Sequence, residues 1–404
     1  MDSDVRKENK EFKMIQALYV CMMSLYELAD KIFGSIYIAF MRSQSLTISQ
    51  ISSLFSLEQI LLAVFDYPTG TIADKHGRKK ITSIGFIVWG IGILNFALAS
   101  NVWLFIPSMV FMALGLALIS GAPASWLTDK MISCNVYENR NEIFPKVMTC
   151  IKFFSVVASV IAYFLISVDH QLTIIVAGCI SIFAGIFGLV TGNDNYGVVK
   201  GENILSTLHI HFIEFMKEKK LKLLALRIVV NNISFLIFVL YWQIYATEVI
   251  KLEPKYLAFC LMIFMVFFMI GNYSVSKITK IFSNFNSSIL GILVSILGFI
   301  VLLSYKTTSG FIFAVGLIEF GFGVELVATS TWMCDYVKSE TRATYSSIFS
   351  TVQAVGGFLF INIIGSIVDA MGLNFAWVIA IVSMCLDILI LILFSSKYKS
   401  ETVI

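Results

Sequence analysis

Long apolar runs separated by short polar segments extend from one end of the chain to the other. A run of about 20 residues is long enough to cross the hydrocarbon core of a bilayer as a helix. The hydrocarbon core of the bilayer contains no water that could hydrogen-bond to the backbone. Each run must therefore form hydrogen bonds between its own amide and carbonyl groups, which it does by folding as a helix. The pattern predicts about twelve spanning helices by this length rule. They are expected at 14–42, 47–68, 81–99, 102–126, 145–167, 171–191, 222–248, 254–275, 285–305, 310–334, 344–370 and 374–395.

The composition excludes a soluble globular protein. Of the 404 residues, 58% are hydrophobic and 14% are charged, which is too little polar surface to face water on all sides. The seven cysteines are scattered without paired spacing, which argues against a disulfide framework or a zinc site. The net charge of +3 gives no sign of a nucleic-acid partner. We expect a lipid bilayer around the chain, and neither a metal nor a cofactor in it.

Basic residues indicate on which side of the membrane each connecting segment lies, because Lys and Arg accumulate in cytoplasmic loops. If the N-terminus is cytoplasmic, only four of the 29 Lys and Arg lie in segments on the outer side of the membrane: Arg42, Lys251, Lys255 and Lys306. Three more lie within helices, which leaves 22 in cytoplasmic segments. A missed helix would invert every later loop and destroy this asymmetry. We therefore expect a multi-pass protein of the cell (inner or plasma) membrane with both termini cytoplasmic and the first helix uncleaved.

A polar segment divides the chain into two halves. We predict an N-terminal bundle at 1–191, a cytoplasmic central loop at 192–221 and a C-terminal bundle at 222–404, with about six helices in each bundle. Within the loop, Ile204 to Lys220 mixes apolar and polar residues. This stretch lies as an amphipathic helix on the inner membrane face, or is a solvated linker.

The two halves contain an internal repeat. Ala124-Ser125-Trp126-Leu127-Thr128-Asp129 ends the fourth predicted helix, and Ser330-Thr331-Trp332-Met333-Cys334-Asp335 ends the tenth. A Trp beside an aspartate at the interface could be anchoring alone, but the same pattern at equivalent positions favours duplication. Parallel repeats of this kind are related by an axis along the membrane normal.

The stretch from Asp66 to Lys80 joins an apolar helix to a tight basic turn that contains glycine at Gly70 and Gly77. It resembles the signature between the second and third helices of the major facilitator superfamily, whose Gly, Asp, Gly, Arg and basic positions fall on Gly70, Asp74, Gly77, Arg78 and Lys79. The resemblance covers nearly the whole chain. It implies an all-α polytopic membrane protein with twelve helices in two pseudo-symmetric bundles.

The resemblance also implies a gating role for this segment. Arg78 has a planar fork suited to carboxylates, and Asp74 and Asp129 are the obvious ones. In the family such a cluster holds the halves together on the cytoplasmic side; the alternative is a basic loop with no gating role. The second half has Val275 where the aspartate would be, so a latch of this type is expected on one side only. The predicted gating residues are Gly70, Asp74, Gly77, Arg78, Lys79 and Asp129.

Two shorter matches point to a branch of the family. Asp66-Tyr67-Pro68 and Tyr241-Trp242-Gln243 resemble segments of tetracycline and multidrug exporters. The fifth helix lacks the Gly-Pro signature of drug/proton antiporters, and the fourth lacks their arginine, so the direction of transport stays open.

Charged residues interrupt the apolar runs, at a cost of at least about 2.5 kcal/mol each on insertion scales. Glu27, Asp30 and Lys31 lie at spacings of three and four and so share a face of the first helix. In one interpretation, Glu27 and Lys31 form an ion pair that neutralises itself and leaves Asp30 as an additional negative charge. In the other interpretation, this face of the helix lines the central cavity. Lys152 and Arg227 lie near cytoplasmic helix ends, where we expect their side chains to extend to the membrane surface.

The resemblance implies that helices 1, 4, 7 and 10 surround the pathway, which favours the carboxylates on them over Asp387. The predicted residues for proton coupling and the substrate cavity are Glu27, Asp30, Glu58, Asp66, Glu319, Glu325, Asn231, Asn232 and Gln243. The four histidines fall in loops, so coupling is expected to rest on Glu27, Asp30 or Glu58, because a carboxyl group withdrawn from water favours its protonated form.

No phosphate-binding loop, hydrolytic triad or redox motif is found, so an ATP-driven pump or an enzyme is not expected. A secondary transporter working by alternating access is predicted, with proton-coupled efflux of a small amphipathic or drug-like compound as the preferred activity. Proton-coupled uptake of a nutrient is the alternative, and a non-transporting sensor or assembly partner is the alternative from another class. Protons and a small-molecule substrate are the expected partners of a monomer.

Overall fold

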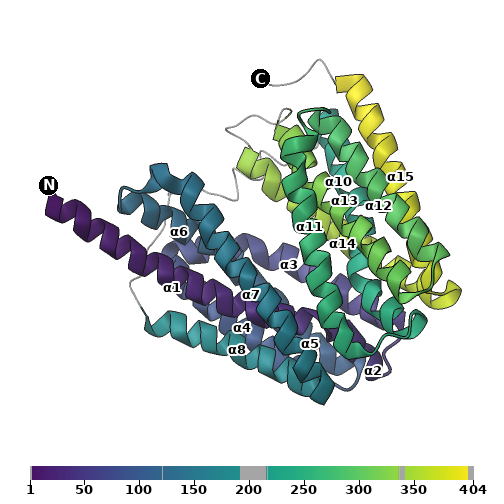
Figure 1. Cartoon of the computed structure of the whole chain (residues 1–404), viewed down its shortest axis with the longest axis horizontal. Coiled ribbons are helices and arrows are strands. Elements are labelled where there is room, and N and C mark those ends of the chain that lie inside the picture. Colours follow the sequence, from purple (N-terminus) through teal and green to yellow (C-terminus); the bar gives the residue numbers. More distant parts are fainter. Residues whose placement is uncertain are drawn as a thin grey trace. The chain divides into compact units, whose positions relative to one another are not determined.

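A computed structural model of the chain describes residues 2–120, 122–191, 215, 217–334, 336 and 342–398, and within these ranges it contains helices and no strands (Figure 1). In the part of the chain that the structure describes, eleven helices are long and apolar enough to cross a membrane, by length and composition. The first helix, α1 (Asp2–Gly34), is not among them, since its apolar part carries three charged residues. The expected all-α polytopic membrane protein is confirmed.

The contacts between Cα atoms group the chain into two compact units. Unit 1 comprises Met1–Leu46, Leu57–Lys200 and Pro254–Phe259. Its elements are α1, α2 (Tyr37–Ser43), α3 (Ile48–His76) from Leu57 onward, α4 (Arg78–Leu98), α5 (Val102–Ile119), α6 (Ala122–Ser133), η1 (Tyr137–Asn139), α7 (Arg140–Val168), α8 (His170–Val190) and η3 (Pro254–Tyr256).

Unit 2 comprises Thr47–Ser56, Gly201–Glu253 and Cys260–Ile404. Its elements are the first nine residues of α3, then α10 (Lys219–Ile244), the π-helical η2 (Tyr245–Val249), most of α11 (Leu257–Ile278), α12 (Asn284–Ser304), α13 (Thr308–Cys334), α14 (Arg342–Met371) and α15 (Leu373–Tyr398). The first turns of α3 thus pack with one unit and the rest of the helix with the other.

Both units follow the same packing plan. In unit 1, α4 packs against α5 and α8, and α1 packs against α7 and α8. In unit 2, α12 packs against α13 and α15, and α10 against α14 and α15. Glycine allows the close approaches: a Cβ on Gly90 would lie 2.8 Å from the carbonyl oxygen of Gly178, and one on Gly291 would lie 2.7 Å from that of Gly321. Corresponding helices therefore have corresponding neighbours.

Several expected boundaries are wrong. The segment after Asp66, expected as a turn, continues α3 to His76; only Gly77, with φ of 101°, separates α3 from α4. The single helix expected at 14–42 begins earlier, at Asp2, and is divided by a turn at Ser35 and Ile36. The helix expected at 102–126 forms α5 and α6, which ends at Ser133. Most of the predicted central loop, including 204–214, and Asp335 of the repeat lie outside the described residues.

Candidate functional sites

The signature residues form a charged cluster where α3, α4 and α6 meet in unit 1. Arg78, in the first turn of α4, donates from Nε to Asp74 Oδ1 at 2.9 Å and from Nη1 to Asp129 Oδ2. The arginine side chain is 15% exposed, and the two carboxylates are 40% and 37% exposed. One planar guanidinium therefore ties the end of α3 to α6, as its forked donor geometry permits.

Gly77 and Lys79 complete this cluster. The positive φ of Gly77 lies in a region that side chains rarely adopt, and it turns the chain directly from α3 into α4. Lys79 is only 3% exposed, and its ammonium donates to the carbonyl oxygen of Thr191, the residue after α8. Gly70 lies inside α3 rather than at a turn. The signature thus connects α3, α4, α6 and the end of α8 within one unit.

A second group of charges lies inside unit 1. Glu27 of α1 is 7% exposed, and its Oε1 accepts bonds from Lys152 Nζ at 2.8 Å and Ser155 Oγ at 2.5 Å, both on α7. Asp30 pairs with its neighbour Lys31 at 2.6 Å. The considered Glu27–Lys31 pair is therefore wrong, since each lysine serves a different carboxylate. Lys152 does not simply extend to the surface, because it neutralises Glu27.

Glu58 of α3 differs from these carboxylates. It is 8% exposed, and no hydrogen bond or ion pair to its carboxyl group is found among the described residues. Tyr26 and Tyr37 lie close enough to Glu58 and Asp30 to interact with them electrostatically. Tyr26 also stacks on Phe86, with ring centroids 4.9 Å apart. In the described part of the chain this buried carboxyl group thus has no counter-ion, and two tyrosines interact with it electrostatically.

Unit 2 contains a buried charge cluster centred on Arg227 of α10, which is 1% exposed. Its Nη2 donates to Glu325 Oε1 at 2.6 Å and to Thr329 Oγ1 at 2.9 Å, both on α13. Its Nε lies 3.0 Å from Asp387 Oδ1 of α15, but the angle is too poor for a hydrogen bond. Asn231 Nδ2 donates to the other oxygen of Asp387 at 3.0 Å. One guanidinium thus faces two carboxylates away from water.

One expectation about this cluster is wrong. Arg227 was expected to reach the membrane surface, yet its guanidinium points into unit 2. Asp387, which the resemblance did not favour for the pathway, is fully buried and paired with Arg227. The sequence did contain a signal for this cluster, because one arginine and two carboxylates lie in three apolar runs of the same half of the chain.

The other predicted residues are dispersed. Asn232 accepts a bond from Gln353 Nε2 at 2.8 Å, and Gln243 is fully buried near the end of α10. Glu319 is half-buried on α13, and no bond to its carboxyl group is found in the described part of the chain. Asp66 is exposed near the middle of α3. None of these residues joins the Arg227 cluster.

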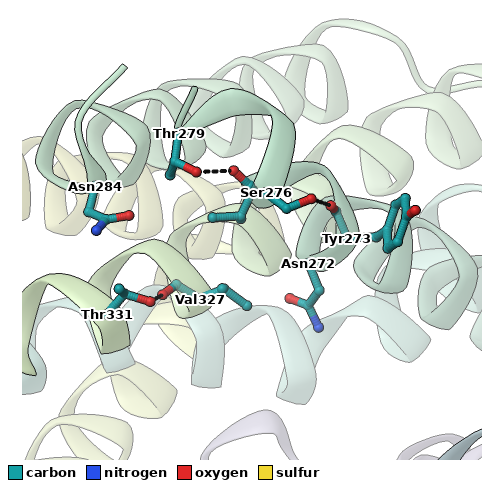
Figure 2. Close-up of a pocket in the computed structure, with 8 residues that line it drawn as sticks. Asn272, Tyr273, Ser276, Thr279, Asn284, Val327 and Thr331 are labelled. Carbon is teal, nitrogen blue, oxygen red and sulfur yellow. Dashed lines mark hydrogen bonds between the residues drawn. The ribbon is translucent and has the colours of Figure 1, made fainter. Parts of the chain in front are cut away.

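A hollow of about 540 Å³ lies at the junction of α11, α12 and α13 in unit 2 (Figure 2). The hydroxyl groups of Ser276, Thr279 and Thr331 each donate to a carbonyl oxygen of their own helix. No charged side chain and none of the predicted site residues lines the hollow. It therefore lacks the chemistry expected of a coupling site.

Among the described residues, no group of three or more His, Cys, Asp or Glu side chains is arranged to hold a metal ion. The chemistry of both units instead consists of ion pairs and carboxyl groups between helices that repeat one packing plan. The sequence profile of the Major Facilitator Superfamily matches residues 19–361, most of the chain. The chain belongs to this superfamily. It is therefore a transporter-family protein rather than an enzyme, and the resemblance inferred from its sequence is confirmed.

Relatives of known sequence support the assignment. The quinolone resistance protein NorA of Staphylococcus aureus is 24% identical over 324 residues, which cover 78% of this chain and 79% of NorA. The uncharacterized MFS-type transporter MJ1317 of Methanocaldococcus jannaschii is 28% identical over 134 residues, only 33% of either chain.

Solved structures share the fold at low identity. A point mutant of the nucleoside transporter NupG superposes with a TM-score of 0.81 at 12% identity, covering 94% of this chain and 99% of NupG. A bacterial homologue of the human lysosomal transporter Spinster gives 0.76 at 15% identity, covering 98% and 99%. These structural similarities establish only the fold, because proteins with the same fold can transport many different substrates.

Proposed function

We propose that this superfamily member exports a small amphipathic or drug-like compound in exchange for protons. Alternating access would expose a substrate site to one side of the membrane and then to the other. The similarity to NorA over most of both chains favours a drug-like cargo. Uptake of a nutrient by the same machinery is the alternative direction.

The buried carboxyl group of Glu58 carries the proposal. An ionised carboxylate inside the membrane is costly without a partner, so such a residue is usually functional. Glu27 and Asp30 each have a lysine at salt-bridge distance, whereas Glu58 has none in the described part of the chain. Of the three carboxylates, Glu58 is thus best suited to take up and release one proton per cycle.

The surroundings of Glu58 support a cationic or lipophilic cargo. Tyr26 stacks on Phe86 and meets Trp89 edge-on at 5.2 Å. Aromatic faces attract organic cations and bury apolar ones. A cation and a proton competing for one carboxyl group would make exchange obligatory. The Arg78 cluster would act as the cytoplasmic latch of the cycle, and the Lys and Arg distribution supports cytoplasmic termini in a cell membrane.

The test is compound-induced proton movement in proteoliposomes that hold a pH-sensitive dye. A panel of lipophilic cations, antibiotics and nutrients is applied to the wild type and to Glu27→Gln, Asp30→Asn and Glu58→Gln. Glu142→Gln is the matched control, because Glu142 is exposed and pairs with the exposed Lys146. A compound should move protons through the wild type and the control but not through Glu58→Gln. Undiminished coupling in all three variants would refute a proton site on these carboxylates.

The direction of flux decides between export and uptake. If no compound on a broad panel moves protons, the non-transporting alternative of a membrane sensor or assembly partner gains support.

A further inference from the structure

The hollow between α11, α12 and α13 lies at the junction that corresponds to the Arg78 cluster of unit 1. That cluster joins α3, α4 and α6, and the internal repeat aligns the end of α6 with the end of α13. Val275 stands where the second half would have the aspartate, and Thr279 follows it by four residues, as Arg78 follows Asp74. Both Val275 and Thr279 line the hollow. An ion pair in one unit therefore corresponds to an open volume of about 540 Å³ in the other.

Two lysines remain beside this hollow. The Lys277 ammonium lies 5.9 Å from the centre of the Tyr273 ring, which lines the hollow and is 74% exposed. Lys280 directly follows Thr279 in the chain and is exposed. Neither lysine forms an ion pair with a carboxylate of the described residues. The hollow thus has two positive charges next to it, for which the described part of the chain supplies no negative partner.

The segment between α11 and α12 has the character of a membrane surface segment. Ile281 and Phe282 follow Lys280 immediately, and they are 79% and 47% exposed. Exposed apolar side chains beside a lysine are typical of a segment that lies at the boundary between acyl chains and head groups. The distribution of Lys and Arg favours the cytoplasmic side for this segment, where the lipid surface carries negative charge. The two lysines are therefore expected at the level of anionic head groups.

The lining of the hollow suits an amphipathic ligand (Figure 2). Val275 and Val327 provide an apolar wall, and Thr279 and Asn284 provide polar groups. Asn284 is the first residue of α12, a helix of 21 residues, so the positive end of its dipole borders the hollow. Phosphate groups bind readily at such helix starts. The volume also lies within the range of about 300–1,000 Å³ that is usual for ligand pockets.

We propose that this hollow binds an anionic phospholipid of the surrounding membrane. Lys277, Lys280 and the first turn of α12 hold its phosphate, and an acyl chain lies along Val275 and Val327. The bound lipid fills the open volume and supplies the negative charge that the carboxylates supply to Arg78 in unit 1. This proposal is independent of the cargo, of the coupling ion and of the direction of transport.

The test is a lipid titration of the purified full-length protein in neutral detergent, with the melting temperature as the readout. A ligand that binds only the folded protein raises this temperature by mass action. Phosphatidylglycerol should raise it by about 3 °C in the wild type, and phosphatidylcholine should not. Lys277→Gln with Lys280→Gln should increase the half-saturating concentration of phosphatidylglycerol about thirtyfold, since two lysines act on one head group. Replacing both by arginine should preserve the wild-type midpoint.

Two further variants separate the hollow from general surface charge. Lys146→Gln with Lys306→Gln removes the same charge from two exposed lysines elsewhere, so the wild-type midpoint should remain. Ser276→Trp keeps the charge but fills the hollow, because Ser276 is exposed and lines it, so the response to phosphatidylglycerol should be lost. Thr331→Phe, at another exposed position of the lining, is the filling variant if the tryptophan variant does not fold.

Several outcomes would overturn the lipid site. Equal stabilisation by inorganic phosphate alone would show that the lysines bind a free anion and not a lipid. An equal response to phosphatidylcholine would show that the head-group charge is not recognised. An unchanged midpoint in Lys277→Gln with Lys280→Gln, or an undiminished response in both filling variants, would place the lipid elsewhere on the protein.

Discussion

The Arg227 guanidinium lies 2.6 Å from the Glu325 carboxylate, with 2% and 9% of the two side chains exposed. Asp387 lies on the same guanidinium, so this site has more negative than positive groups when all are ionised. Removing one partner from a buried ion pair leaves an uncompensated charge, which destabilises more than the pair itself stabilises. The cluster should therefore respond asymmetrically to substitution.

Replacing Arg227 by Met should lower the free energy of unfolding by about 3 kcal/mol or more, because two carboxylates lose their cation. Thermal unfolding in detergent measures the loss. Adding Glu325→Gln and Asp387→Asn should recover much of it, since no buried charge is then left alone. A triple variant no more stable than Arg227→Met would show that the charges are not the cause.

Lys152 should matter through Glu27. Lys152→Ala removes the lysine from the Glu27 carboxylate and keeps the bond from Ser155, so unfolding should occur at a lower temperature. In the double variant with Glu27→Gln, the added effect of Lys152→Ala should shrink toward zero. The lysine is 42% exposed, so the coupling is expected at about 1 kcal/mol. Strictly additive effects in the cycle would show that the two residues do not interact.

Arg78→Lys should impair transport although it keeps the positive charge. Lysine cannot reproduce a fork that bonds Asp74 and Asp129 at once, so one of the two carboxylates loses its bond to residue 78. Because both carboxylates are more than a third exposed, stability should fall by no more than about 1 kcal/mol. The comparison is initial transport rate against melting temperature. Wild-type rates in Arg78→Lys would argue against a gating role.

Gly77→Ala should destabilise the protein by about 1–3 kcal/mol, because a side chain strains the backbone at a φ of 101°. Gly316→Ala is the control: that glycine is helical, and its new methyl group would meet only the side chain of Phe267, 3.2 Å away. Thermal melts of both variants test the difference. Equal effects would mean that the backbone conformation of Gly77 is not what requires glycine.

The fold could be predicted well from the sequence, because each apolar run of sufficient length indicates one membrane-spanning helix. A lipid bilayer allows a single chain segment to cross it in few conformations other than a helix. The sequence also named both carboxylates that Arg78 binds, since Asp74 is one helical turn away and Asp129 belongs to the repeat. It failed at Arg227, whose partners on α13 and α15 are about 100 and 160 positions away. A basic residue near the end of an apolar run looks the same whether it extends to the surface or turns inward.

Accumulation of a cargo against its own gradient tests the central claim most directly. A pH gradient is imposed across proteoliposomes, and the concentration of a compound that moves protons through the wild type is followed on both sides. We predict that the compound moves in the direction opposite to the protons and accumulates against its gradient, and that a protonophore abolishes this accumulation. Glu58→Gln should not accumulate the compound, whereas Glu142→Gln should accumulate it as the wild type does. Equal accumulation in wild type and Glu58→Gln, or accumulation indifferent to the pH gradient, would contradict proton exchange at Glu58.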